Sequence, residues 1–566
     1  MDRRMDAGRP ALSGRGWPRP RAAWLVLLPP LVFVALFLAY PLQGIMRESF
    51  AGESRNLSDL RPLVEGTFYL ERAWFTLWQA AVSTLLTLAL ALPCAYVLAR
   101  YDFRGKSLVV ALATVPFVLP TVVVAVAFTA LIGPQGALND LLRWVFGLER
   151  PPIRLLNTAW IVLIAHVFYN FAMAARIIAA YWANLDERTE EAAAMLGAGR
   201  IERFWSVTLP LLRPAVLGAG ALVFLFSFTS FGVVLILGGP GYGTIETEIY
   251  RETIFLFRLP VAAALALLQA LFTFGVIALY TAAQRSHPGG GFRRPRARRW
   301  GRAERVFVPA TVGLLLLITL MPLGALVERS FHGSEGYTLA FYRSLDDNVR
   351  GQVLFVSPLS AIWNSLRFAL LTLALAVPLG TLAAYGARMA PRRLGHLLES
   401  VFLLPLGVSA VTLGLGFLVT LDEPPLDLRG NAALLVIAHT IIGYPFVARA
   451  VGAQLRGMDP RLREAARTLG AKPQQVFLEV DLPIIWRALA VGAVFAFAIS
   501  MGEFGATLLI TRPEWATMPV AIFRYLGQPG ALNYGQALAM SSILMAVTAA
   551  GFLALERLRF RGLGTF

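Results

Sequence analysis

Two segments of the sequence share one pattern of acidic, small and helix-breaking residues. Each begins with a Glu-Ala-Ala triplet, has a glycine four residues after the second alanine, and has a Leu-Pro pair twelve residues after that glycine. The two copies are Glu191, Ala192, Ala193, Gly197, Leu209 and Pro210, and Glu464, Ala465, Ala466, Gly470, Leu482 and Pro483. Residues of these types suit the docking of another protein rather than covalent chemistry.

Each copy predicts a short helix that ends at its glycine. Glutamates stand in the first turn of this helix, where carboxylates suit the positive end of the helix dipole. The alanines leave a face that another protein can approach closely, and the glycine ends or bends the helix. A second short segment follows, Arg200 to Val207 in the first copy, and the proline then resets the backbone before the next apolar run. We expect helical elbows over about 186–214 and 459–487.

Polar residues inside apolar runs are the second group of candidates. Glu503 lies mid-run, where a carboxylate is costly unless it is paired or wetted. It either faces a central cavity and attracts a cationic ligand, or pairs with an arginine of a neighbouring helix for assembly alone. Ser230 is its counterpart in the internal repeat described below. Arg367 either pairs with Glu503 or marks the same pathway.

Histidines and arginines near the elbows have simpler interpretations. His166 and His439 are expected to be packed core residues, because no second histidine or cysteine stands at ligand spacing. The single cysteine, Cys94, also lies in an apolar run, so we expect no metal site and no disulfide. Arg176 and Arg449 lie fifteen residues before the two Glu-Ala-Ala glutamates. They are expected to reach the membrane surface and brace the elbows.

Composition indicates that most of the chain lies in a membrane. The 566 residues are 57% hydrophobic and 15% charged, with a mean hydropathy of +0.63. Soluble proteins are about 45–50% apolar and about 25% charged. The net charge of +17 comes from arginines between apolar runs. That distribution favours membrane topology over nucleic-acid binding.

Twelve apolar runs approach or exceed the length of a membrane span. They are about 24–46, 74–99, 107–132, 158–182, 215–238, 260–282, 306–327, 362–387, 397–421, 432–454, 488–510 and 536–555. Because backbone groups must be satisfied internally in hydrocarbon and no barrel-type alternation is present, each run is predicted to be a helix. The predicted fold class is therefore an all-α membrane protein. A basic N-terminus over 1–23 is expected to precede an uncleaved first helix.

The distribution of lysine and arginine predicts the orientation. Counted on alternate sides of the twelve runs, the side that holds the N-terminus carries 33 of these residues and the opposite side carries 15. Because positive residues gather on the cytoplasmic side, both termini are expected to face the cytoplasm.

The chain contains an internal repeat, as membrane transporters often do. Trp78, Pro93 and Pro120 recur 285 residues later as Trp363, Pro378 and Pro405, and from His166 to Gly232 the offset becomes 273 residues. The chain is therefore interpreted as two units, 24–282 and 306–566. They are joined by an arginine- and glycine-rich cytoplasmic linker over 283–305.

The duplicated pattern resembles the signature of type I permeases of binding-protein-dependent ABC importers. This resemblance extends over nearly the whole chain as two fused six-helix units, about 12 transmembrane helices in all. It implies that both elbows, at the twelve residues named above, dock into two ATP-hydrolysing subunits. It also implies a prokaryotic plasma membrane and an extracytoplasmic binding protein that delivers the substrate.

No cofactor is expected in this chain, and ATP-Mg is expected on the partner ATPase. Gly105-Lys106-Ser107 is similar to the end of a phosphate-binding loop. However, Arg100 stands where the first glycine of such a loop is required, and no strand precedes it. The chain is therefore expected to be a transport subunit and not an enzyme.

The sequence is compatible with several classes of substrate. The fused layout resembles permeases for iron(III) and for thiamine, and the stretch from Ser230 to Glu246 resembles the thiamine branch. Gly502-Glu503-Phe504-Gly505 also resembles permeases for sulfate and molybdate, and a polyamine is a further alternative. Outside this family, the alternative is a twelve-span transporter driven by an ion gradient. A membrane enzyme is disfavoured because the five histidines are scattered.

Overall fold

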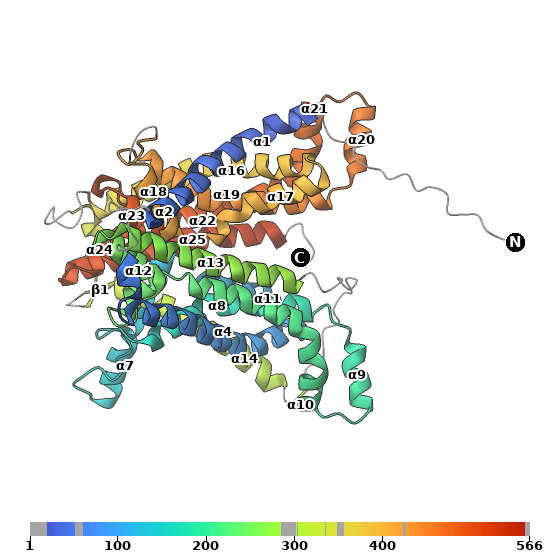
Figure 1. Cartoon of the computed structure of the whole chain (residues 1–566). Helices are drawn as coiled ribbons and strands as arrows, with labels where there is room; N and C mark the ends of the chain where they lie inside the picture. The colour runs from blue at the N-terminus through green and yellow to red at the C-terminus, as the bar shows by residue number, and fades with distance from the viewer. Residues whose placement is uncertain are drawn as a thin grey trace.

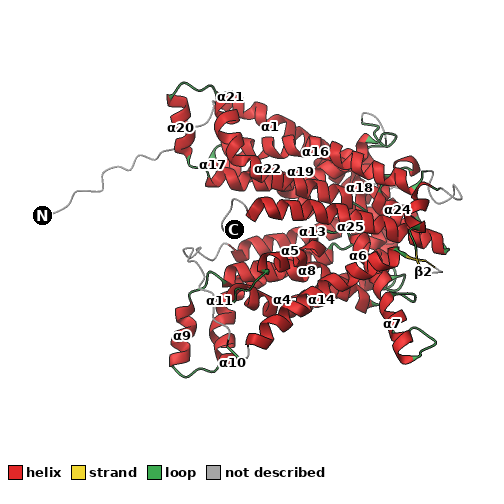
Figure 2. Cartoon of the chain, turned by 180° about the vertical axis from the view of Figure 1, so that it is seen from behind, coloured by secondary structure: helices red, strands yellow, loops and turns green. Residues whose placement is uncertain are grey.

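The computed structural model describes residues 20–50, 60–284, 301–302, 304–333, 336–347, 356–422 and 426–560. Helices make up most of these residues, and the one sheet among them is an antiparallel pair of two-residue strands (Figure 2). The basic N-terminus over 1–23 and the linker over 283–305 lie almost wholly outside the described residues.

The first half contains thirteen of the described α-helices. They are α1 (Pro20–Val34), α2 (Tyr40–Phe50), α3 (Arg61–Val64), α4 (Phe68–Arg100), α5 (Lys106–Val118), α6 (Thr121–Ile132), α7 (Ala137–Phe146), α8 (Ala159–Trp182), α9 (Glu187–Met195), α10 (Arg200–Arg203), α11 (Leu209–Phe228), α12 (Ile245–Ile254) and α13 (Leu259–Gln284).

The second half contains the remaining described helices and both strands. They are α14 (Glu304–Ser330), β1 (His332–Gly333), β2 (Gly336–Tyr337), α15 (Ala340–Arg343), α16 (Pro358–Met389), α17 (Arg392–Leu403), α18 (Ala410–Thr420), α19 (Ala433–Gly457), α20 (Pro460–Thr468), α21 (Pro473–Gln475), α22 (Leu482–Gly502), α23 (Gly505–Ile510), α24 (Met518–Leu526) and α25 (Ala531–Phe560).

The number of spans agrees with the sequence. Among the described residues, eleven helices are long and apolar enough to cross a membrane. A pair bent by 94°, Arg392–Gly407 and Ala410–Thr420, raises the total to as many as 12. The all-α membrane fold predicted from the apolar runs is thus confirmed.

The helices of the two halves pack in the same way, as the duplication in the sequence predicts. In the first half α4, α8 and α11 pack on one another, and in the second half α16, α19 and α22 do the same. These helices are related by the sequence offsets, so the two halves are built on the same three-helix core.

Each half gives its first helix to the other half. Helix α1 packs along α16, and α2 packs against α13 and α18, whereas α14 packs against α4, α5 and α6. Figure 1 shows the N-terminal blue helices lying beside orange ones from the second half. The two halves are therefore continuous in sequence but exchange a helix in space.

Several apolar runs are interrupted instead of forming single straight helices. The run 107–132 breaks between α5 and α6, where Pro120 precedes the first turn of α6. The run 488–510 breaks after Gly502, and Glu503 stands in extended backbone before α23. The prediction that Glu503 lies within a spanning helix was wrong. Proline and glycine interrupt the hydrogen-bond ladder at these points, and neighbouring helices cover the freed backbone.

The second segment of each elbow is continuous with the span that follows it. Single helical runs extend over Arg200–Phe228 and Pro473–Gly502. We expected each proline to reset the backbone, but a wider π-helical turn, Phe204–Thr208 or Val476–Asp481, immediately precedes it. This turn accommodates the missing proline N–H without ending the helix.

Candidate functional site

The first elbow is a helix with defined ends. The Asp186 carboxylate begins α9 by accepting a hydrogen bond from the Arg188 N–H at 3.1 Å. At the other end Gly197 has a φ of 88°, in the left-handed region that favours glycine. The Ala198 N–H donates to the Ala193 carbonyl at 3.1 Å. This arrangement closes the helix and turns the chain back toward the bundle.

The second elbow has the same construction. Asp459 caps α20 through the Arg461 N–H at 2.9 Å, and Gly470 also has a φ of 88°. The Ala471 N–H donates to the Ala466 carbonyl at 3.1 Å. The helix ends predicted at both glycines are therefore confirmed.

Both elbows project from the same end of the bundle (Figure 1). Leu196 and Leu469, which the repeat relates, are 90% and 89% exposed at the two tips, and Met195 is 90% exposed. Glu191 and Glu464 are exposed as well. Exposed apolar side chains beside carboxylates are typical of a surface that a partner covers.

An arginine from the adjoining span fastens the first elbow. Arg100 Nη1 lies 2.5 Å from Glu187 Oε1, and its Nη2 lies 3.1 Å from Glu190 Oε1. The Thr208 hydroxyl donates to the same Glu190 oxygen at 3.0 Å. The Arg100 side chain is only 4% exposed. This cluster joins α4, α9 and the π turn before α11.

The second elbow uses the same positions with different residues. Arg463 Nε donates to Asp481 Oδ1 at 2.6 Å, and the Arg463 guanidinium lies 5.9 Å from the centre of the Tyr385 ring. By the repeat offsets, Arg463 corresponds to Glu190, Asp481 to Thr208 and Tyr385 to Arg100. The charged contact therefore occupies the same place in both elbows, but the elbow helix contributes a glutamate in the first and an arginine in the second.

Arg176 and Arg449, the residues predicted to brace the elbows, lie on α8 and α19. Arg176 donates to the Thr114 hydroxyl at 2.9 Å and lines the same cavity as Pro483, and Arg449 is exposed. The ion pairs with the elbows that are described above come from Arg100 and Arg463. Sequence reasoning missed them because Arg463 and its repeat counterpart carry opposite charges and so do not match.

Removing one partner of the Arg463–Asp481 pair should be strongly destabilising, because both side chains are 7% exposed and the remaining charge would be left buried. Breaking a buried pair from one side costs about 3–5 kcal/mol. We expect Arg463→Met to lower the free energy of unfolding by about 3 kcal/mol, whereas Arg463→Met with Asp481→Leu recovers most of it. Thermal unfolding of the purified variants measures this. Equal destabilisation by the single and double variants would contradict the interpretation.

Two adjoining cavities lie between the halves. The inner cavity, of about 600 Å³, is lined by α5, α8, α19 and the start of α22, including Arg176, Pro483 and Arg487. The deep cavity, of about 350 Å³, continues along α22 to Gly505. Phe117 and Phe495 line both. Together the cavities form a route that begins near the elbows and ends at the helix breaks.

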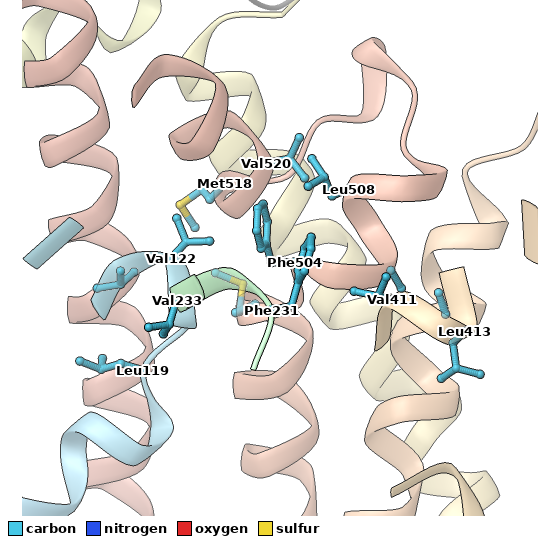
Figure 3. Close-up of a cluster of buried hydrophobic side chains, with 14 of the residues drawn as sticks. Leu119, Val122, Phe231, Val233, Val411, Leu413, Phe504, Leu508, Met518 and Val520 are labelled. Atoms are coloured by element: carbon cyan, nitrogen blue, oxygen red, sulfur yellow. The ribbon is translucent and has the colours of Figure 1, made fainter. Parts of the chain in front are cut away.

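Two phenylalanines meet where this route ends. The rings of Phe231 and Phe504 stack with their centres 5.5 Å apart and their planes at 29°. The repeat relates these residues, so each half contributes the same position. Figure 3 shows the two rings facing each other among Val122, Met518 and Val520. This Phe231–Phe504 stack lines the deep cavity where the helices break.

The duplicated elbows and the paired halves agree with the relatives of this chain. The family described as "Binding-protein-dependent transport system inner membrane component" matches residues 88–286 and 376–561. The chain belongs to this family. One matched stretch lies in each half, so the protein is a type I ABC importer permease with both units in one multi-pass inner-membrane chain.

Several curated proteins are similar to the permease over most of its length. The thiamine transport system permease protein ThiP of Escherichia coli is 28% identical over 468 residues, covering 80% of this chain and 83% of that protein. ThiP of Haemophilus influenzae is 26% identical and covers 84% and 89%. A probable ABC transporter permease protein of Sinorhizobium fredii, y4fN, is 26% identical and covers 94% and 96%.

A crystal structure of a bacterial ABC transporter involved in alginate import is also similar. The match covers 47% of the permease and 98% of that chain, with 19% identity and a TM-score of 0.41.

The structure of the permease places Glu503 at the wall of the deep cavity. Its carboxylate accepts hydrogen bonds from the N–H groups of Ala506 and Thr507, both at 2.8 Å, and from the Thr507 hydroxyl. His439 Nε2 lies 3.6 Å away. The charge of Glu503 is thus held by the start of α23, and the carboxylate still borders the cavity.

The other two predicted pathway residues, Ser230 and Arg367, lie in different parts of the structure. Ser230 is 7% exposed and lines the deep cavity with Glu503. Arg367 is exposed on α16, beside the exposed Trp363 and Leu370. It lines neither cavity and is not a partner of Glu503 among the described residues, because α16 turns it away from the bundle. Of the two alternatives expected for Arg367, pairing with Glu503 is therefore not found among the described residues, and a place on the pathway has no support from either cavity.

Sequence reasoning missed a second carboxyl group at the deep cavity. Glu246 on α12 is fully buried, and Gln269 of α13 donates a hydrogen bond to it. Burial raises the pKa of the Glu246 carboxyl to about 8, although the nearby Ser409 and Gln269 side chains act in the opposite direction. The internal repeat did not point to Glu246, because the corresponding residue in the second half is Pro519.

Proposed function

We propose that this permease is the translocation subunit of an ATP-driven importer whose two ATPase subunits dock on the elbows at residues 186–214 and 459–487. The exposure of Leu196 and Leu469 at two equivalent tips, on one end of the molecule, is the observation that carries this proposal. ATP-Mg acts on those subunits, and no cofactor is assigned to this chain. Glu191 to Ala193, Glu464 to Ala466 and the two Leu-Pro pairs form the docking segments.

The same proposal fixes the orientation. The elbows face the cytoplasm of a prokaryotic cell, together with both termini, and the Phe231–Phe504 stack faces the opposite side. This orientation is supported by the 33 to 15 bias in lysine and arginine. A binding protein delivers substrate to the side of the stack.

Coupling follows from the continuity of the helices. The segment after each elbow runs unbroken to Phe228 or Gly502, close to the Phe231–Phe504 stack. The Arg100 and Arg463 clusters join each elbow to the base of the same helix. When ATP draws the ATPase subunits together, α11 and α22 move with the elbows as rigid levers and part the stack. Hydrolysis then restores the arrangement seen in this structure.

Thiamine is the substrate we propose. Similarity to ThiP proteins over about four fifths of the chain supports it, as does the pair of carboxyl groups at the deep cavity. Iron(III) is the second candidate, and an oxyanion or a polyamine follows. A twelve-span transporter driven by an ion gradient is the alternative outside the family.

Reconstitution tests this function. Proteoliposomes holding the permease, its co-purified ATPase and its binding protein are offered labelled thiamine or ferric iron, with ATP on the ATPase side. We expect thiamine uptake that requires ATP and both partners. Uptake of iron instead would overturn the substrate assignment, and uptake driven by a proton or sodium gradient without an ATPase would overturn the class.

A further inference from the structure

The deep cavity is bordered by three buried polar side chains that each keep one atom without a hydrogen-bond partner among the described residues. These atoms are Glu246 Oε2, His166 Nε2 and Asn170 Oδ1. All three residues are at most 2% exposed. A buried polar atom without a partner costs about 1–3 kcal/mol. Three such atoms in the wall of one cavity are therefore groups that a polar ligand would satisfy once these side chains turn toward it.

Glu246 supplies the acidic side of this site. Gln269 donates to its Oε1, and the neighbouring Ser409 hydroxyl donates to Thr412, so Oε2 receives no proton donor from the described residues. Because burial raises the pKa of Glu246 to about 8, its carboxyl is mostly protonated in the empty cavity, and a bound cation would favour the ionised form and complete the coordination of Oε2. Glu503 borders the same cavity from the other half and adds negative potential.

His166 and Asn170 lie one turn apart on α8 and supply the neutral polar side. His166 Nδ1 lies 3.3 Å from the Ser83 hydroxyl, and the Asn170 amide N–H donates to the His166 carbonyl at 3.0 Å. The repeat counterpart His439 has both ring nitrogens occupied, by Ser500 at 2.8 Å and Thr507 at 2.9 Å. The open nitrogen is therefore specific to the first half.

Aromatic rings form much of the remaining wall. They are Phe117, Tyr169, Phe226, Phe231, Phe446, Phe495 and Phe504. The faces of such rings attract cations and stack on flat heterocycles. The volume of about 350 Å³ lies within the range of small-molecule sites.

We propose that the deep cavity is a substrate subsite for a small aromatic cation, in which Glu246 receives the positive charge and His166 and Asn170 hydrogen-bond the heterocycle. This inference rests on the proposed function and deepens it, because thiamine is such a cation. A bare trivalent metal ion would need more oxygen ligands than two carboxyl groups on separate walls provide.

Equilibrium binding to the purified permease in lipid nanodiscs tests the subsite. The probes are tritiated thiamine and 1-methylnicotinamide, a smaller aromatic cation with an amide. We expect thiamine to bind, and Glu246→Gln to raise its Kd about tenfold or more. Asn170→Leu and His166→Phe should each raise it severalfold. Glu248→Gln is the matched control, because Glu248 lies on the same helix and pairs with Arg72 outside the cavity.

The outcomes separate the subsite from the proposed function. An unchanged thiamine Kd in Glu246→Gln and Asn170→Leu, or binding of neither probe to the wild type, overturns the subsite even if ATP-driven thiamine uptake is observed. Binding of 1-methylnicotinamide alone, lost in Glu246→Gln, supports the subsite and overturns thiamine as the substrate. Size-exclusion profiles confirm that each variant is folded.

Discussion

A permease carrying both Gly197→Asp and Gly470→Asp is expected to lose ATP-driven uptake by about a hundredfold or more, while it still inserts into the membrane. Both glycines have a φ of 88°, where any side chain strains the backbone. Nothing lies within 4 Å of the position that a Cβ would occupy, so the new carboxylates point outward from the elbow tips. Each carboxylate would have to be desolvated against the docked ATPase, and both docking sites fail together.

The measurement is uptake in proteoliposomes, together with the amount of ATPase that co-purifies with each variant. Gly197→Ala combined with Gly470→Ala is the control, since it strains both turns at the same φ without adding a charge. Normal uptake by the double aspartate variant would refute the coupling assignment. Equal loss in the control would assign the effect to backbone strain alone.

A second large effect is expected when both rings of the Phe231–Phe504 stack are removed. Phe231→Ala with Phe504→Ala takes away the contact that lines the deep cavity where the helices break, and with it the edge contacts to Tyr250 and Phe523. We expect the route to be open at the helix breaks once both rings are gone. We expect proteoliposomes loaded with thiamine to lose it without ATP, at least about tenfold faster than with the wild type.

Phe224→Ala with Phe228→Ala is the matched control for this experiment. These rings also stack, at 5.8 Å and 16°, but they line neither cavity. The control should cost stability without opening a leak. If proteoliposomes with the folded Phe231 and Phe504 double variant lose thiamine no faster than those with the wild type, other residues close the route.

Local features of the sequence predicted much of this structure. Apolar runs of spanning length identified the spans, because the energetic cost of unpaired backbone in lipid leaves a helix as the only choice. The elbow ends were predictable because Gly197 and Gly470 need no distant partner to adopt a positive φ. The repeat was readable because equivalent residues such as His166 and His439 fill equivalent buried positions.

Features that depend on contacts between the halves were not predictable. Hydropathy reports the total length of an apolar run and does not show where the helix breaks, so Glu503 was placed inside a helix. The exchange of α1 and α14 leaves no trace in either helix's own sequence. Glu246 was missed because its environment is assembled from α12, α13 and the start of α18, and α18 lies more than 150 residues further along the chain.

The exchanged first helices impose an order on synthesis. Helix α1 leaves the ribosome roughly 340 residues before its partner α16 begins, a delay of about 20 to 70 s at ordinary elongation rates. During that time its side facing α16 must be covered by lipid or by the insertion machinery. The first half therefore cannot mature before the second half is made. Chains that terminate early should be recognisable to membrane proteases by an unpartnered first helix.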